Sequence, residues 1–185
     1  MLPALFFNHL NIITMACLIS AGRLEGCKDA VGGLNAIYFI NFGDMGDLTV
    51  SDETVTGIAA STPDAFKYDL RGTSTFDQSL TSSRDNGSTF AEQTLTVSLK
   101  RQDATTHKEV KMLAYGRPHV IIEDNNGNAW LMGEEFGAEM NATTSTGASL
   151  GDKSGYELSF VAMEKGLAKE YTGVIATDFS VTLGA

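Results

Sequence analysis

The sequence has few cysteines, few prolines and few cations, and each shortage excludes a class of protein. Its two cysteines, Cys17 and Cys27, are too few for a small disulfide-stapled scaffold, and without clustered histidines they predict free thiols rather than a zinc site. Thirteen Lys and Arg against 23 Asp and Glu give a net charge of −10, which disfavours a protein that grips nucleic acid through its phosphates. Three prolines beside nineteen glycines fit many turns between short strands.

The sequence also lacks the motifs of a catalytic site. It contains no Gly-rich phosphate-binding loop, and no serine or cysteine is placed by a nucleophile motif. His119 and Glu123 would share one face of a strand, but no third group is placed to orient them, so we interpret His119 as a structural histidine. We therefore predict that the protein is not an enzyme and carries no cofactor and no metal.

One acidic stretch has the spacing of a calcium-binding loop. Asp124, Asn126, Asn128 and Glu135 occupy the positions from which oxygen ligands could surround a hard cation. The sharp turn of such a loop requires a glycine at its sixth position, where this chain has Ala129. We therefore interpret the stretch as a plain hairpin turn.

The N-terminal segment is apolar but lacks the features of a targeting sequence. No Lys or Arg precedes Arg23, so the positive region of a signal peptide is missing, and polar residues interrupt Leu2–Ile19, which argues against a membrane span. Translation from Met15 would make the first fourteen residues an artefact, and a cleaved signal-like segment is the alternative.

The rest of the chain has the pattern of short strands. A length of 185 residues predicts one domain, and we expect an arm over residues 1–33 and a single β domain over residues 34–185. In Phe90–Lys100 the leucines and the valine point one way and the threonines and the serine the other, as in a half-buried strand. With the turn signal Asn86-Gly87, residues 65–100 are expected to form one long hairpin.

One segment departs from the strand period. Asp103–Tyr115 has helix-forming composition, and Asp103 or Thr105 can cap its first turn. Gly116 suits a left-handed residue at its C-terminal end, and a helix this short must dock on a sheet. These features predict a mainly β fold with one short helix, of the α+β class. Further strands are expected at Ala36–Phe42, Leu48–Val55, Val120–Glu123, Ala129–Met132, Gly137–Thr143, Tyr156–Met163 and Val174–Leu183.

This order of long hairpin, strand, helix, hairpin and return strand resembles the phage tail tube protein family. The local sequence is similar to that of virion proteins of tailed bacteriophages at Gly22–Leu34, Ile37–Asn41 and Gly151–Tyr156. The likeness in the order of elements covers roughly Cys17 to Met163. The resemblance implies two packed, nearly orthogonal antiparallel sheets, in a sandwich or barrel, with the helix at one side. It also implies hexameric rings that stack into a tube, with the long hairpin and the N-terminal arm reaching the next ring.

The resemblance sets the expected partners and location. The protein would lie in the tail of a virion, assembled in the host cytoplasm, and would contact its own copies and other tail proteins but no membrane. Double-stranded DNA would pass through the tube during ejection without specific binding, which suits an acidic wall. The polar strand positions expected to line this lumen are Asp77, Ser79, Thr81, Thr94, Thr96 and Ser98.

A second group of residues is expected at contacts between subunits. The local basic cluster around the helix is by default a solvated face, but in an assembly it could pair with acidic residues of a neighbour. The long hairpin would bring its tip to the next ring. The candidates are Arg84, Asp85, Asn86, Lys108, Lys111, Glu134 and Glu135.

Two other functions fit the same sequence. A tail terminator or head–tail adaptor would share the fold but stop at one ring. A secreted β-sandwich that binds a ligand would need removal of the N-terminal segment and a Cys17–Cys27 disulfide. The size of the assembled protein separates the first from a tube.

Overall fold

The computed structural model describes residues 21–59 and 62–183, and the chain divides into two compact units, residues 1–30 and 31–185. In the described part of the first unit, residues 21–30 carry no helix or strand, and Cys27 is an exposed free thiol. Cys17, the apolar segment before it and Met15 lie outside the described residues. None of the described helices has the length and apolar character needed to cross a membrane.

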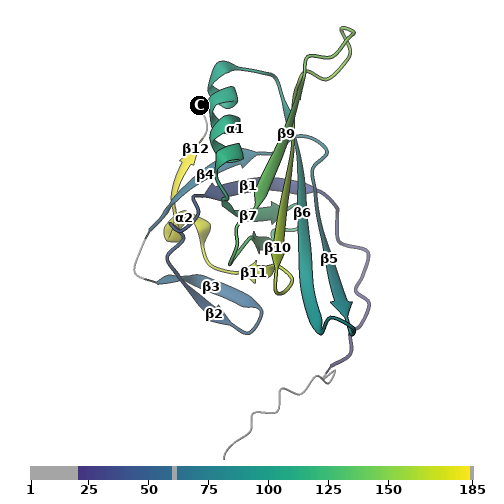
Figure 1. The fold of residues 1–185 in the computed structure, drawn as a ribbon, viewed down its shortest axis with the longest axis vertical. Coiled ribbons are helices and arrows are strands. Elements are labelled where there is room, and N and C mark those ends of the chain that lie inside the picture. Colours follow the sequence, from purple (N-terminus) through teal and green to yellow (C-terminus); the bar gives the residue numbers. More distant parts are fainter. Residues whose placement is uncertain (1–20, 60–61, 184–185) are drawn as a thin grey trace, which may run out of the picture. The chain divides into compact units, whose positions relative to one another are not determined.

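The second unit is built from twelve strands and two helices in the described chain (Figure 1). The smaller sheet has the strand order β5-β6-β10-β9, and the larger one has the order β12-β4-β1-β7-β8-β11-β3-β2. In chain order the elements are β1 (Leu34–Ile40), β2 (Asp47–Ser51), β3 (Thr54–Ala59), β4 (Asp64–Asp69), β5 (Thr75–Ser83), β6 (Ser88–Lys100), α1 (Ala104–Tyr115), β7 (His119–Asp124), β8 (Ala129–Met132), β9 (Glu139–Ser145), β10 (Gly155–Glu164), β11 (Lys169–Tyr171), α2 (Ile175–Asp178) and β12 (Ser180–Leu183).

The expected mainly β sandwich is confirmed, with two amendments. The smaller sheet is antiparallel throughout, but the larger one is mixed, because β11 runs parallel to β3 and β12 runs parallel to β4. Neither sheet closes into a barrel. In Figure 1 the strands of the smaller sheet run up and down the view, whereas β1, β4 and β7 run across it.

Two hydrophobic clusters form the core, one on each face of the larger sheet. The first lies between the sheets, where Ile37 and Phe39 of β1 meet Leu158 and Phe160 of β10. The second cluster takes the alternate residues of β1, including Ile40, and packs them against the curled remainder of the same sheet and α2. A strand buried on both faces has no reason to alternate, which explains the continuous apolar run of β1.

Helix α1 begins as expected and ends differently. Asp103 is the N-cap, because its Oδ1 accepts a hydrogen bond of 2.7 Å from the amide of Thr106. Val110 turns into the core between the sheets. The prediction of a left-handed Gly116 is wrong: this residue is extended, with φ −91°, and its amide bonds to the carbonyl of Met112. The chain therefore leaves the helix directly into the extended run toward β7.

Three predicted segments are divided differently in the structure. The expected hairpin over residues 65–100 is too long, because β4 pairs with β1 in the larger sheet and the hairpin consists of β5 and β6 alone. The single strand expected at Leu48–Val55 is the hairpin β2–β3, which turns at Asp52 with φ 53°. Val174–Leu183 forms the one-turn helix α2 followed by β12, so the expectation of a single helix is also wrong.

Two predicted turns are confirmed. Gly87, with φ 61°, closes the β5–β6 hairpin, and this conformation is accessible to glycine without strain. Asp124 organises the β7–β8 turn, because its Oδ1 accepts from the amides of Asn126 and Asn128, each at 2.8 Å. The acidic stretch is therefore a hairpin turn, whose carboxylate is already occupied by backbone donors.

Candidate functional surface: the polar face of the smaller sheet

One face of the smaller sheet is mainly polar, although Phe90 of β6 and Val161 and Met163 of β10 also lie on it. Residues directly opposite each other in a sheet point to the same side, and Asp77 of β5 lies opposite Thr94 of β6, which lies opposite Val161 of β10. The same register aligns the next alternate positions along each strand. The structure thus brings together all six residues expected to line a lumen: Asp77, Ser79, Thr81, Thr94, Thr96 and Ser98.

The opposite face of the two inner strands, β6 and β10, is buried, whereas the outer strands β5 and β9 are exposed along most of both faces. Leu95, Val97, Leu158 and Phe160 have none of their surface exposed, whereas Thr96 and Asp77 are exposed. The alternation in β6 therefore reports a real division between a core side and a solvent side. The core-facing side chains of β6 stabilise the fold, so its solvent-facing side chains can serve another role.

The polar face is acidic. The paired positions that share it include a carboxylate on each of the four strands, and Lys100 stands at its end, where β6 leaves the sheet. The carboxylates are Asp77, Glu92, Glu157 and Glu139. Apart from Lys100, no Lys or Arg occupies a strand position on this face among the described residues.

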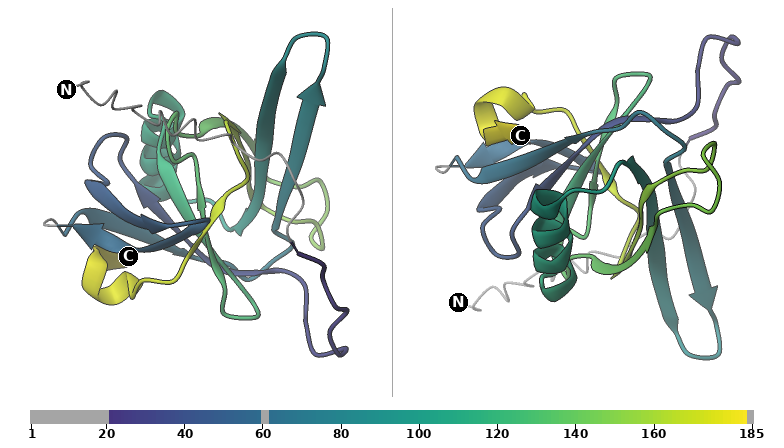
Figure 2. Two further views of the ribbon diagram at one scale, coloured as in Figure 1. Left: turned by 90° about the horizontal axis from the view of Figure 1, so that it is seen from below. Right: turned by 90° about the horizontal axis from the view of Figure 1, so that it is seen from above.

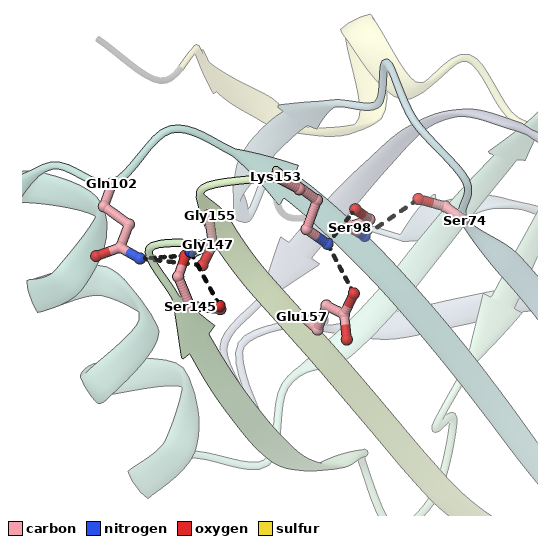
Figure 3. Close-up of polar contacts among 8 residues, drawn as sticks. All are labelled: Ser74, Ser98, Gln102, Ser145, Gly147, Lys153, Gly155 and Glu157. Carbon is pink, nitrogen blue, oxygen red and sulfur yellow. Dashed lines mark hydrogen bonds and ion pairs between the residues drawn. The ribbon is translucent and has the colours of Figure 1, made fainter. Parts of the chain in front are cut away.

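A cation reaches the face from the β9–β10 loop (Figure 3). The Nζ of Lys153 donates to Glu157 Oε1 at 2.7 Å and to Ser98 Oγ at 2.9 Å. This hydrogen bond and the charge of Lys153 lower the pKa of Glu157, so the carboxylate stays ionised and the pair adds no net charge. At the start of β10 the backbones of β10 and β6 approach so closely that a Cβ at Gly155 would overlap the carbonyl oxygen of Leu99.

The polar face ends in two unpaired strand edges. β5 and β9 are the outer strands of the smaller sheet, and within the described chain no further strand pairs with either. The β5–β6 hairpin continues past β10, which pairs with β6 only from Ala91 to Lys100, and Figure 2 shows it extending away from the other strands. Exposed edges of this kind invite pairing with another chain.

The residues expected between subunits lie at three separate places. Arg84, Asp85 and Asn86 form the exposed turn of the β5–β6 hairpin. Lys108 and Lys111 are exposed on α1, and only Lys108 faces the groove beside the helix.

Glu134 and Glu135 already have partners in their own chain. Lys169 Nζ lies 2.6 Å from Glu134 Oε1, and Lys165 Nζ lies 2.6 Å from Glu135 Oε2. A role for the two glutamates between subunits stays a prediction, but their charge is neutralised before a second copy arrives.

His119 is buried in a structural role. Its Nδ1 donates to the carbonyl of Gly133, its Nε2 accepts from the amide of Gly43 at 3.4 Å, and its ring stacks on Phe42. Burial lowers the pKa of His119. Glu123, which could have acted with it, instead accepts from Asn35 and from Tyr38.

A buried carboxylate was not anticipated from the sequence. Glu164 ends β10, is 6% exposed, and accepts hydrogen bonds from the amides of Glu135 and Phe136. Burial raises the pKa of Glu164, against the effect of these two bonds. The sequence could have indicated this burial, because the alternation of β10 places Glu164 on the same side as the buried residues Phe160 and Ala162.

Comparison of the chain with protein-family models, with curated protein sequences and with solved structures found no match.

Proposed function

We propose that this chain is the structural subunit of a phage tail tube, which assembles into stacked rings and forms a conduit for DNA. The observation that carries the proposal is the acidic polar face of the smaller sheet, bounded by the free edges of β5 and β9. The buried opposite face of β6 and β10 packs the smaller sheet against the larger one.

The charge of the face suits a channel wall. Asp77, Glu92 and Glu139 repel the phosphates of a passing duplex. Short hydroxyl side chains lie between them, and of the two cations at this face Lys100 stands at its end and Lys153 is paired with Glu157. A wall that bound DNA would hold the genome in place, whereas a weakly repulsive wall lets it slide. The chain as a whole is also acidic, with a net charge of −10.

The free edges suit closure into a ring. A contact between two different edges of identical subunits is heterologous, and such contacts form rings when the rotation closes. If β9 of one copy pairs with β5 of the next, the four-stranded sheets join into a continuous barrel with no edge left open. The polar face then lines the inside.

Assembly is the test. Light scattering and negative-stain microscopy of the purified protein at rising concentration should show rings and stacks of rings. Roughly six subunits of 19.7 kDa give a ring of about 118 kDa. A monomer that persists at high concentration would contradict the proposal. Rings that never stack would favour a tail terminator or head–tail adaptor, and a monomer with a Cys17–Cys27 disulfide would favour a secreted binding module.

A further inference from the structure

A groove beside α1 gathers nearly half of the chain's cations. It lies between α1 and the β4 and β12 end of the larger sheet, has a volume of about 1120 Å³, and is also lined by the last residues of β6. Six of the thirteen Lys and Arg residues line it, with only two carboxylates, Asp69 and Glu109. The cations are Lys67, Arg71, Lys100, Arg101, Lys108 and Arg117.

These cations are largely unpaired. Lys67 forms an ion pair with Asp69 at 3.0 Å, and the guanidinium of Arg117 lies over the ring of Phe42. Among the described residues, the other four groove cations have no carboxylate within ion-pair distance. Free cations held in a concave surface of an acidic protein indicate a site for an acidic partner.

The rim of the groove is apolar and exposed. Met112 and Tyr115 of α1 are 59% and 79% exposed, and Leu183 of β12 is 68% exposed. Large apolar side chains around a charged concavity are the composition of a protein interface rather than of a site for a small ion. The partner therefore brings carboxylates together with apolar surface.

The chain carries such a surface at the other edge of the larger sheet. Between Lys28 and Lys67 it has no Lys or Arg, and the β2–β3 hairpin presents the exposed carboxylates of Asp47, Asp52 and Glu53 around Val50, which is 42% exposed. β2 and β12 are the two outer strands of this sheet. In Figure 1 the β2–β3 hairpin lies towards the bottom of the view, and β12, β4 and α1, whose residues line the groove, lie towards its top.

We infer that the groove beside α1 binds the β2–β3 hairpin of a second copy of this chain. The contact joins the basic end of one larger sheet to the acidic end of the next and is head-to-tail, so it can repeat through an assembly. It rests on the proposed function, because it supplies a contact between subunits. It also replaces Glu134 and Glu135, which are paired within the chain, as the acidic partner of Lys108.

Charge reversal on each side tests the inference. The groove variant carries Arg71→Glu and Lys108→Glu, and the hairpin variant carries Asp47→Lys and Glu53→Lys. Each alone should raise the protein concentration needed for half-assembly by about tenfold or more, since like charges then meet at the contact. Lys111→Glu is the matched control, because this residue is on the same helix but does not line the groove. It should leave assembly unchanged, and that result would remove Lys111 from the residues expected between subunits.

An equimolar mixture of the two variants gives the decisive result. In the mixture each reversed groove can meet a reversed hairpin, so assembly should return with the two variants alternating, and higher salt should weaken it. Circular dichroism and thermal unfolding of each variant show whether it is folded. If the variants are folded and assemble like the unmodified chain, or if the mixture fails to recover assembly, the inference is wrong while the tube proposal stands. If the unmodified chain forms no assembly at all, the proposed function itself fails.

Discussion

The two sheets of this protein differ in how their faces are buried. The larger sheet is buried on both faces along most of β1 and β7, so these strands are mainly apolar and serve the core. The smaller sheet buries one face of β6 and β10, and its other face is mainly polar and carries a carboxylate on each of the four strands. The difference shows that the smaller sheet offers a surface that the fold itself does not need, which is where we expect function.

The largest difference should appear when neighbouring residues of β10 are truncated. Phe160 is fully buried between the sheets, with its ring 5.0 Å from that of Phe39, whereas Ser159 lies on the polar face. Phe160→Ala should lower the free energy of unfolding by about 3–5 kcal/mol because it leaves a cavity. Ser159→Ala, the matched control, should change it by less than about 0.5 kcal/mol. Urea unfolding measures both, and similar losses would show that the two faces do not differ as described.

A smaller effect, with a pH signature, is expected in the larger sheet at His119. Burial lowers its pKa below the ordinary 6.5, while the Gly133 carbonyl and the carboxylates of Asp44 and Glu134 act in the opposite direction. The unfolded chain therefore takes up the proton first, and this histidine makes the free energy of unfolding fall as the pH drops below 6.5.

His119→Asn keeps a donor for Gly133 but loses the stack on Phe42 and the acceptor for Gly43. It should cost about 1–3 kcal/mol at neutral pH. It should also flatten the fall in stability between pH 7 and 5.5. Unfolding curves at several pH values check this. If the free energy of unfolding depends on pH as steeply in the variant as in the unmodified chain, protonation of His119 is not the cause of the loss of stability in acid.

The smallest effect on stability is expected on the polar face itself. Asp77→Lys should change the free energy of unfolding by less than about 0.5 kcal/mol, because Asp77 is exposed and makes no ion pair among the described residues. Assembly should persist, and the rings should now retain duplex DNA at low salt, since a cation faces the lumen.

Asp64→Lys makes the same change of charge on β4 of the larger sheet and should not retain DNA. Retention is measured by co-sedimentation of DNA with assembled rings at two salt concentrations. Loss of assembly in Asp77→Lys would place this residue at a contact between subunits instead of in the lumen.

Local patterns predicted much of the fold. The alternation in Phe90–Lys100 identified both faces of β6, and Asp103 and Gly87 marked the start of α1 and the turn of the β5–β6 hairpin. The errors fall where pairing is non-local. β12 lies parallel to β4, more than a hundred residues away in sequence, and β11 has only three residues, too few to show a period.

The candidate surfaces divide in the same way. The polar face could be predicted, because each of its strands carries alternation that can be read locally. The groove could be predicted only in part. The sequence places Lys100 and Lys108 in one local basic cluster, but Arg71 and Arg117 come from other segments, and only the fold brings them to the same groove.

The sequence by itself determined that the protein is acidic, mainly β and equipped with one strongly amphipathic strand, because composition and period depend on neighbouring residues alone. Only the tertiary structure decided that β4 joins the larger sheet and that the cations collect in one groove. It also placed the acidic hairpin and the basic groove at opposite ends of one sheet. These outcomes depend on which strands, distant in sequence, pack their apolar faces together. The local pattern of apolar and polar residues does not specify that pairing.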